Sequence, residues 1–252
     1  MEFTYLPGLG LSEEQLKTFH KYRDFLLEWN TKVNLTAITD PEEVEIKHFL
    51  DSLLLKQCRL WQAAEGQLFR GAGNNAGVQS ANVSSVRVAD VGGGAGFPGI
   101  PLKIMDGSIT LDTFEASEKR VVFLQALAEA LAFEGVRAVH LRAEEAGRDP
   151  LYRESYDRVV SRGVAAMPVL LEYCLPLLKV GGYMAAYKGP AGPEEAVAGK
   201  KAAALLGGKL EETFNATLPE GQGERCILIY RKVKPTPKKY PRRPGVPAKQ
   251  PI

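Results

Sequence analysis

Apolar side chains recur at helical spacing early in the chain, at Leu16, Phe19, Tyr22, Phe25, Leu26 and Trp29. This period predicts an amphipathic helix, and Ser12 with Gln15 forms a capping box at its start. A second helix start lies at residues 40–43, where an N-cap Asp precedes a Pro and then an acid at the third helical position. Apolar positions continue this second pattern to residue 55. Two or three helices are therefore expected before any strand.

From residue 86 the pattern changes to short β-rich runs that alternate with helical ones. The predicted strands are residues 86–91, 109–114, 138–141, 157–161, 183–187 and 226–230, and the predicted helices are residues 119–133, 167–178 and 193–206. This alternation predicts a mostly parallel central sheet with helices on both faces, in a Rossmann-like α/β fold.

Composition divides the chain into four parts. Residues 1–57 form an N-terminal helical extension, and residues 86–231 form the core. Residues 58–85 are expected to be a flexible linker or insertion, because residues 71–85 have no charge and almost no large apolar side chain to offset the entropy of ordering. Residues 232–252 form a basic tail, whose six prolines predict extended, polyproline-like chain.

Charge is distributed unevenly along the chain. The net charge is +2, yet residues 231–252 hold eight Lys or Arg and no acid, which leaves 24 basic and 30 acidic residues elsewhere. A cationic tail on an acidic body favours contact with nucleic acid or an acidic membrane surface.

Length and cysteine usage narrow the class of protein. A chain of 252 residues that is 45% hydrophobic can bury one large core. Cys58, Cys174 and Cys226 lie outside any CxxC spacing, which predicts buried small side chains rather than disulfides or a metal site. No stretch approaches the roughly 18 apolar residues of a membrane span, and the N-terminus has no signal pattern, so we expect a cytoplasmic protein.

The strongest chemical motif is residues 88–99, Val-Ala-Asp-Val-Gly-Gly-Gly-Ala-Gly-Phe-Pro-Gly. A strand leads through a glycine turn into a helix start, where a ligand can approach bare backbone and free N–H groups. Residues 94–99 match the Gly-x-Gly-x-x-Gly fingerprint of dinucleotide enzymes, so a nicotinamide or flavin cofactor is one interpretation. Asp90, two residues before Gly92, favours S-adenosylmethionine instead, because an acid in that position is typical of class I methyltransferases.

Further candidates lie at the ends of the next predicted strands. Glu115 comes 23 residues after Gly92, where a carboxylate can bind both ribose hydroxyls of either cofactor. Glu144 follows the third strand, either beside an adenine ring or as an ordinary acid at a helix start. Arg162 ends the fourth strand, either facing the ligand crevice or forming a surface salt bridge.

Several separate motifs together resemble one family. They are residues 34–38 (Asn-Leu-Thr-Ala-Ile), 47–53 (Lys-His-Phe-Leu-Asp-Ser-Leu), 94–102, 119–121, 142–145, 160–162, 188–189 and the tail at 235–242. Over nearly the whole chain they are similar to the ribosomal RNA small subunit methyltransferase G family, also called glucose-inhibited division protein B. The resemblance implies a protein that transfers a methyl group from S-adenosylmethionine to N7 of one guanine in 16S ribosomal RNA. We expect this protein to be a monomer.

The resemblance also implies the site residues. The cofactor contacts would be Gly92, Gly94, Phe97, Glu115, Ala116, Ala143, Glu144 and Arg162. Asn34 and His48 are candidates for holding the guanine, with a capping Asn and a packed His as the alternatives. Candidates for contacts with RNA are Lys119, Arg120, Arg142, Lys188, Lys238, Lys239, Arg242 and Arg243, any of which could instead belong to a solvated face. No catalytic acid or base is assigned, because guanine N7 carries a lone pair and no proton.

The chain departs from the family in three places. Gly93 stands where Thr or Ser is more usual, and Tyr187 stands where leucine is usual. Residues 71–85 look like an insertion.

Three other functions stay open on the sequence alone. A methyltransferase for another RNA, a small molecule or a protein is one, and a small-molecule or protein substrate would not require the basic tail. A nicotinamide-dependent oxidoreductase would bind NAD in preference to S-adenosylmethionine. A non-catalytic RNA-binding protein with the same fold would show no methyl transfer.

Overall fold

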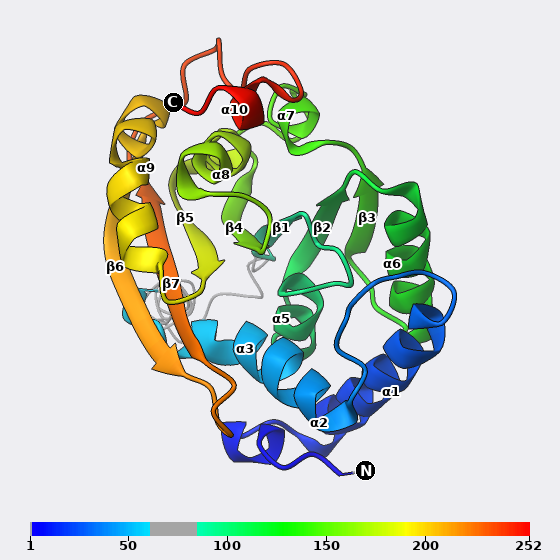
Figure 1. Cartoon of the computed structure of the whole chain (residues 1–252). Helices are drawn as coiled ribbons and strands as arrows, with labels where there is room; N and C mark the ends of the chain where they lie inside the picture. Colours follow the sequence, from blue (N-terminus) through cyan, green and yellow to red (C-terminus); the bar gives the residue numbers. More distant parts are fainter. Residues whose placement is uncertain (1, 61–84) are drawn as a thin grey trace, which may run out of the picture.

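The computed structural model describes residues 2–60 and 85–252, and a seven-stranded sheet runs through its centre (Figure 1). The strands are β1 (Arg87–Val91), β2 (Thr110–Glu115), β3 (Val136–His140), β4 (Tyr156–Arg162), β5 (Leu178–Lys188), β6 (Gly208–Thr217) and β7 (Glu224–Lys232). Their order is β3-β2-β1-β4-β5-β7-β6, with β1 to β5 parallel and β7 antiparallel to both neighbours. The predicted Rossmann-like α/β class is confirmed. The predicted flexible linker falls mostly on residues 61–84, which lie outside the described residues.

Helices cover both faces of the sheet. One hydrophobic core contains residues of α1 (Glu13–Asn30), α2 (Pro41–Val44), α3 (Asp51–Leu53), α5 (Gly99–Met105) and α6 (Glu118–Ala130). The other contains residues of α7 (Ala143–Ala146), α8 (Met167–Cys174) and α9 (Gly192–Leu206), and α10 (Val246–Lys249) lies against α8. Val88 belongs to the first core and Ala89 to the second, as the alternation of a strand buried on both faces requires. The remaining turns are η1 (Leu6–Leu9), the π-helix η2 (Glu45–Leu50), η3 (Leu54–Gln57) and η4 (Leu175–Leu177).

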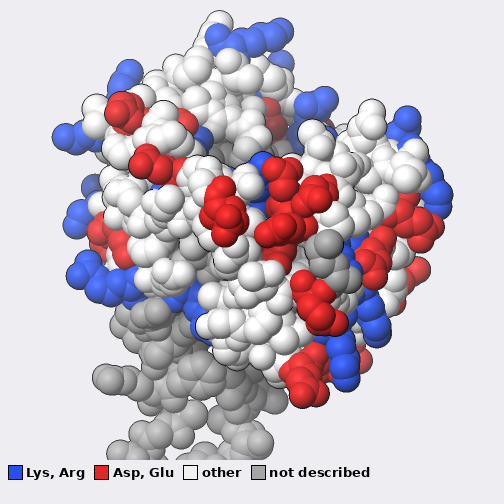
Figure 2. Space-filling model, turned by 60° about the horizontal axis from the view of Figure 1, so that its bottom comes forward, with Lys and Arg blue, Asp and Glu red and all other residues white. Residues whose placement is uncertain are grey.

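Both predicted helix starts are present. The Gln15 N–H donates to Ser12 Oγ at 3.2 Å, and Gln15 Oε1 accepts from the Ser12 N–H at 2.8 Å. Asp40 Oδ1 accepts from the N–H groups of Glu42 and Glu43. These helices form much of the side of the molecule that Figure 2 brings forward, where acidic side chains gather near the middle and basic ones lie mostly toward the edges. Because α1 and α2 each carry two acids in their first turn, this side is unfavourable for a polyanion.

Two predictions inside the core need correction. Strand β6 was not predicted, because its sequence mixes charged and apolar residues, as an edge strand with one solvated face does. The helix expected over residues 167–178 ends at Cys174, since Pro176 cannot donate the next helical hydrogen bond. Leu178 already begins β5, which extends to Lys188.

The tail is folded rather than extended, so that prediction is wrong. Tyr240 and Thr236 are buried, and residues 246–249 form α10. Lys232 is fully buried, where its Nζ donates to the carbonyls of Leu175 and Leu178 and to Thr236 Oγ1. The prolines restrict the chain, but these tertiary contacts decide its path.

A buried carboxylate joins the N-terminal helices to the sheet. Asp51, at the start of α3, is 4% exposed. Its Oδ2 lies 2.9 Å from Arg162 of β4, and its Oδ1 lies 3.2 Å from Nε of Arg225 in β7. Between these strands, Tyr187 of β5 donates its hydroxyl to the Ser52 carbonyl at 2.6 Å. Three adjacent strands thus hold α3, and Tyr187 provides a bond that the leucine usual in the family would lack.

We predict that Asp51→Ala lowers the free energy of unfolding by about 3 kcal/mol, because it leaves two partly buried guanidinium groups without their shared carboxylate. Urea unfolding measures the change. The matched control is Glu28→Ala, which breaks the exposed Glu28–Lys32 pair and should cost less than about 1 kcal/mol. Equal effects of the two substitutions would contradict a structural role for the buried cluster.

Candidate cofactor site

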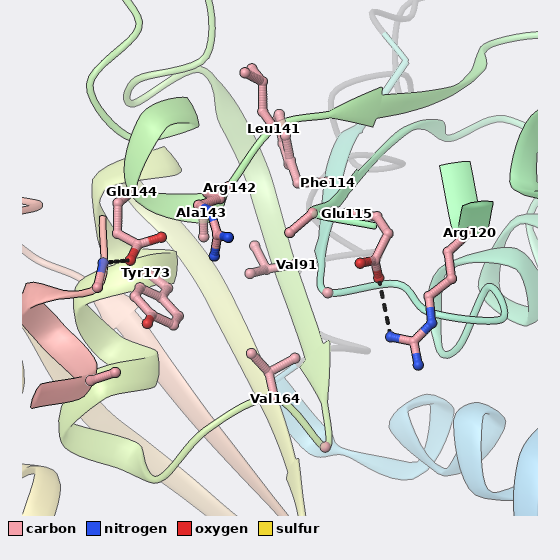
Figure 3. Close-up of a pocket in the computed structure, with 15 residues that line it drawn as sticks. Val91, Phe114, Glu115, Arg120, Leu141, Arg142, Ala143, Glu144, Val164 and Tyr173 are labelled. Carbon is pink, nitrogen blue, oxygen red and sulfur yellow. Dashed lines mark hydrogen bonds and ion pairs between the residues drawn. The ribbon is translucent and has the colours of Figure 1, made fainter. Parts of the chain in front are cut away.

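A cavity of about 410 Å³ lies at the carboxyl ends of β1 to β4 (Figure 3). Parallel strands bring these ends to one edge of the sheet, where ligands of open α/β sheets bind. The volume suits a small organic ligand. Five of the predicted cofactor contacts line the cavity: Gly92, Glu115, Ala116, Ala143 and Glu144.

The turn after β1 requires glycine at two successive positions. Gly92 has φ +74°, and a Cβ there would lie 2.4 Å from Val164 Cγ2. A Cβ on Gly93 would lie 2.1 Å from Thr113 Cγ2. Thr113 of β2 therefore occupies the space that a side chain at position 93 would need.

Asp90 supports this turn from inside the protein. It is fully buried, and its Oδ2 accepts from the Gly99 N–H at 2.9 Å, at the start of α5. Its Oδ1 has no hydrogen-bond partner among the described residues. Burial raises the pKa of Asp90 to about 7, although the Gly99 N–H and Arg162 act in the opposite direction. Asp90 does not line the cavity, so it acts through the turn.

Glu115 presents a fixed carboxylate to the cavity. Its Oε2 accepts from the Gly94 N–H at 3.1 Å, and its Oε1 accepts from the Ser117 N–H at 2.9 Å. Arg120 lies 3.8 Å from Oε2 (Figure 3). A carboxylate has about four acceptor positions, so it can accept two more hydrogen bonds from a ribose diol. Gly94 thus helps to orient Glu115, and its own contact with a cofactor stays a prediction.

On the opposite side of the cavity lies Glu144, in the first turn of α7. It is 4% exposed, and its Oε1 accepts from the Gly245 N–H at 2.9 Å. Its neighbour Tyr173 has a raised pKa, caused first by burial and then by the charge of Glu144. Arg120 and Arg142, predicted as RNA contacts, both line this cavity.

Phe97 and Arg162 lie together outside the residues that line the cavity. The Phe97 ring stacks on His48 at 4.4 Å, and the Arg162 guanidinium lies 4.9 Å from the Phe97 centroid. Arg162 also donates to the Lys47 and His48 carbonyls of the π-helix η2. Both residues therefore connect the glycine turn to the N-terminal helices, and their contact with a cofactor stays a prediction.

His48 is packed as a neutral ring. Burial, followed by the charge of Arg162, lowers its pKa to about 3. The Arg162 guanidinium lies 3.2 Å from Nδ1 of His48, while Nε2 lies 2.8 Å from Thr36 Oγ1. Since a guanidinium can only donate, we assign the proton of His48 to Nε2.

The remaining candidates are dispersed. Asn34 is exposed, and the neighbouring Asn30 makes the loop bonds to Leu35 and Thr36. Lys188 is held by Glu195 at 2.7 Å, and Arg242 by Glu172 at 2.6 Å. The exposed cations among the candidates are Lys119, Arg142, Lys238, Lys239 and Arg243.

Eight lining residues were not predicted as site residues: Val91, Phe114, Leu141, Gly163, Val164, Tyr173, Gly245 and Ala248. Val164 lies two residues beyond the end of β4, so its position near a strand end could have indicated it. Gly245 and Ala248 come from the tail, whose prolines favoured a different interpretation. Only the tertiary path of the tail brings them here.

The described residues contain no group of three or more His, Cys, Asp or Glu placed to hold a metal ion. None of the helices in residues 2–60 and 85–252 is both long and apolar enough to cross a membrane. Cys58, Cys174 and Cys226 are free and buried, as predicted.

The sheet order, with its antiparallel β7, and the cavity beside the glycine turn define a class I, Rossmann-like methyltransferase. Residues 15–65 and 75–222 match the model of the rRNA small subunit methyltransferase G family, named GidB. The chain belongs to this family.

Relatives of that name align with almost the whole chain. Ribosomal RNA small subunit methyltransferase G of Alkaliphilus metalliredigens (strain QYMF) is 44% identical over 245 residues, which cover 97% of this chain and 94% of that protein. The protein of the same name from Lysinibacillus sphaericus (strain C3-41) gives the same identity and coverage. Among solved structures, M. jannaschii TYW2 in complex with AdoMet is similar with a TM-score of 0.46 and 17% identity, over 71% of this chain and 80% of that one.

Asp90→Asn tests the buried carboxylate under the turn. A pKa raised from 3.8 to about 7 means that the folded protein holds the proton more tightly than the unfolded chain. Ionisation of Asp90 therefore lowers the free energy of unfolding progressively as the pH rises from about 4 to about 7. The loss is about 1.4 kcal/mol for each pH unit in this range. We predict that the stability of Asp90→Asn relative to the wild type increases over this pH range and is constant above it. Urea unfolding at stepped pH measures the difference, and a pH-independent difference would contradict the burial of the ionised group.

Proposed function

We propose that this chain, as a monomer, transfers the methyl group of S-adenosylmethionine to N7 of a guanine in 16S ribosomal RNA. The observation that carries the proposal is the cavity itself, which unites a bare glycine turn, the Glu115 carboxylate and the Glu144 carboxylate at one sheet edge. Membership of the methyltransferase G family supports the choice of substrate.

The residues present fit an adenosyl sulfonium cofactor. Glu115 would accept hydrogen bonds from the ribose hydroxyls, and Ala143 with Glu144 would face the adenine. The backbone at Gly92 would approach the methionine end. Asp90, buried beneath the same turn, holds the start of α5 through the Gly99 N–H and so keeps the turn in place.

Methyl transfer to guanine N7 requires little acid–base chemistry from the protein. When bound, S-adenosylmethionine supplies an electrophilic methyl group. N7 attacks with an in-plane lone pair and loses no proton, so the chain must position the two partners in line and exclude water. Consistent with this, His48, whose ring stacks on Phe97, is neutral, and its two ring nitrogens are bonded to Arg162 and Thr36.

Exposed cations near the cavity are suited to RNA phosphates. Lys119 lies at the start of α6, next to the cavity-lining Arg120, and Lys238, Lys239 and Arg243 lie on the tail that reaches the cavity at Gly245. Each phosphate contact with single-stranded RNA adds about 0.7 to the salt dependence of binding, as a log–log slope. Arg242 is excluded from this set because it is paired with the buried Glu172.

The proposal is tested by incubating the protein with methyl-labelled S-adenosylmethionine and 16S ribosomal RNA from cells that lack the modification, followed by mapping of the labelled nucleotide. We expect label on N7 of one guanine. RNA already modified at that nucleotide is the matched control and should take up no label. Label on another atom or nucleotide would contradict the specific assignment. Preferential binding of NAD, with no transfer, would contradict the methyltransferase assignment.

A further inference from the structure

The C-terminal segment, residues 240–252, forms one side of the cofactor cavity. Gly245 and Ala248 line it, opposite the side formed by Glu115 and Arg120. In Figure 3 the short helix α10 and the backbone before it lie beside Glu144 and Tyr173. The C-terminal segment therefore borders the part of the cavity where we propose that the adenine ring binds.

This segment is held in place by specific bonds to the core. The Arg242 guanidinium and backbone N–H both bond Glu172 of α8, a carboxylate with no solvent exposure. Arg148 donates to the Pro241 carbonyl at 2.9 Å, and Arg153 donates to the Tyr240 carbonyl at 2.7 Å. These anchors all precede Gly245, so they fix the path of the backbone that reaches the cavity.

Gly245 connects this backbone to the site. Its φ of +80° suits glycine, and in this conformation its N–H donates to Glu144 Oε1 at 2.9 Å. Figure 3 shows that the other oxygen of Glu144 lies on the cavity side. A hydrogen bond from a backbone N–H to a carboxylate fixes the orientation of that carboxylate.

We propose that residues 240–252 form a structural part of the cofactor site. In this arrangement Gly245 positions Glu144 to accept a hydrogen bond from the 6-amino group of adenine. The inference rests on the proposed function, because it assumes an adenosyl cofactor in this cavity. Gly245 is a positioning residue. The bond that it makes to Glu144 gives the cofactor site selectivity for adenine over a base that carries oxygen at position 6.

The probes are S-adenosylhomocysteine and S-inosylhomocysteine, which differ in that 6-substituent, with affinities measured by calorimetry. The wild type should prefer the adenosyl compound by about tenfold or more, the value of one charge-assisted hydrogen bond. Removal of residues 245–252 keeps Arg242 paired with Glu172 but removes the Gly245 N–H, and the preference should fall to about twofold or less. Gly245→Val is a second variant of full length, because a β-branched residue does not adopt this φ. Gln250→Ala, an exposed change in the same segment, is the control and should keep the preference.

Glu144→Gln separates positioning from general damage to the fold. If the segment acts through Glu144, the truncation should add no further loss of preference to Glu144→Gln, because coupled residues are not additive. Equal weakening of both compounds by the truncation, or an unchanged preference in both the truncation and Gly245→Val, would overturn the inference. If the wild type binds neither compound, the proposed function fails instead.

Discussion

The turn after β1 is the constraint on which the site depends. Gly92 turns the backbone with a φ of +74°, the neighbouring side chains leave no space for a Cβ on Gly92 or Gly93, and the buried Asp90 carboxylate holds the start of α5 through the Gly99 N–H. The parallel arrangement of β1 to β4 then places Glu115 and Glu144 at the same edge, although they are distant in sequence. The cavity follows from these two facts together, because the bare turn leaves space that the acidic strand ends surround.

Two buried carboxylates, Asp51 and Glu172, connect the N-terminal helices and the tail to this core through ion pairs. Asp51 joins the N-terminal helices to Arg162 and Arg225 of the sheet, and Arg242 joins the tail to Glu172 of α8. Removing one member of such a pair lowers the stability of the fold by more than the pair contributes to it, because a buried charge is left unpaired. The N-terminal segment thereby meets the back of the glycine turn at Phe97, and the tail meets the adenine side at Glu144.

Much of the fold could be predicted from sequence because its signals are local. The capping boxes, the β-rich runs and the glycine turn depend on residues close together, and they predicted the strands that carry the site. The positions of Glu115 and Glu144 followed from strand ends, whereas Ala143 followed from the family resemblance. The edge strand β6, the path of the tail and the direction of Arg162 depend on tertiary partners, namely β7, Glu172 and the π-helix η2. No local pattern around Arg162 distinguishes a side chain that faces a ligand from one that is bonded to Asp51.

The central claim is that the cavity at the carboxyl edge holds the adenosyl cofactor through Glu115. Calorimetric titration with S-adenosylhomocysteine tests it most directly in the wild type, Glu115→Gln and the exposed neighbouring control Glu118→Gln. The account predicts that Glu115→Gln weakens binding by about tenfold or more, the loss of charge-assisted bonds to the ribose, while Glu118→Gln leaves it unchanged. Equal affinity in all three proteins would contradict it.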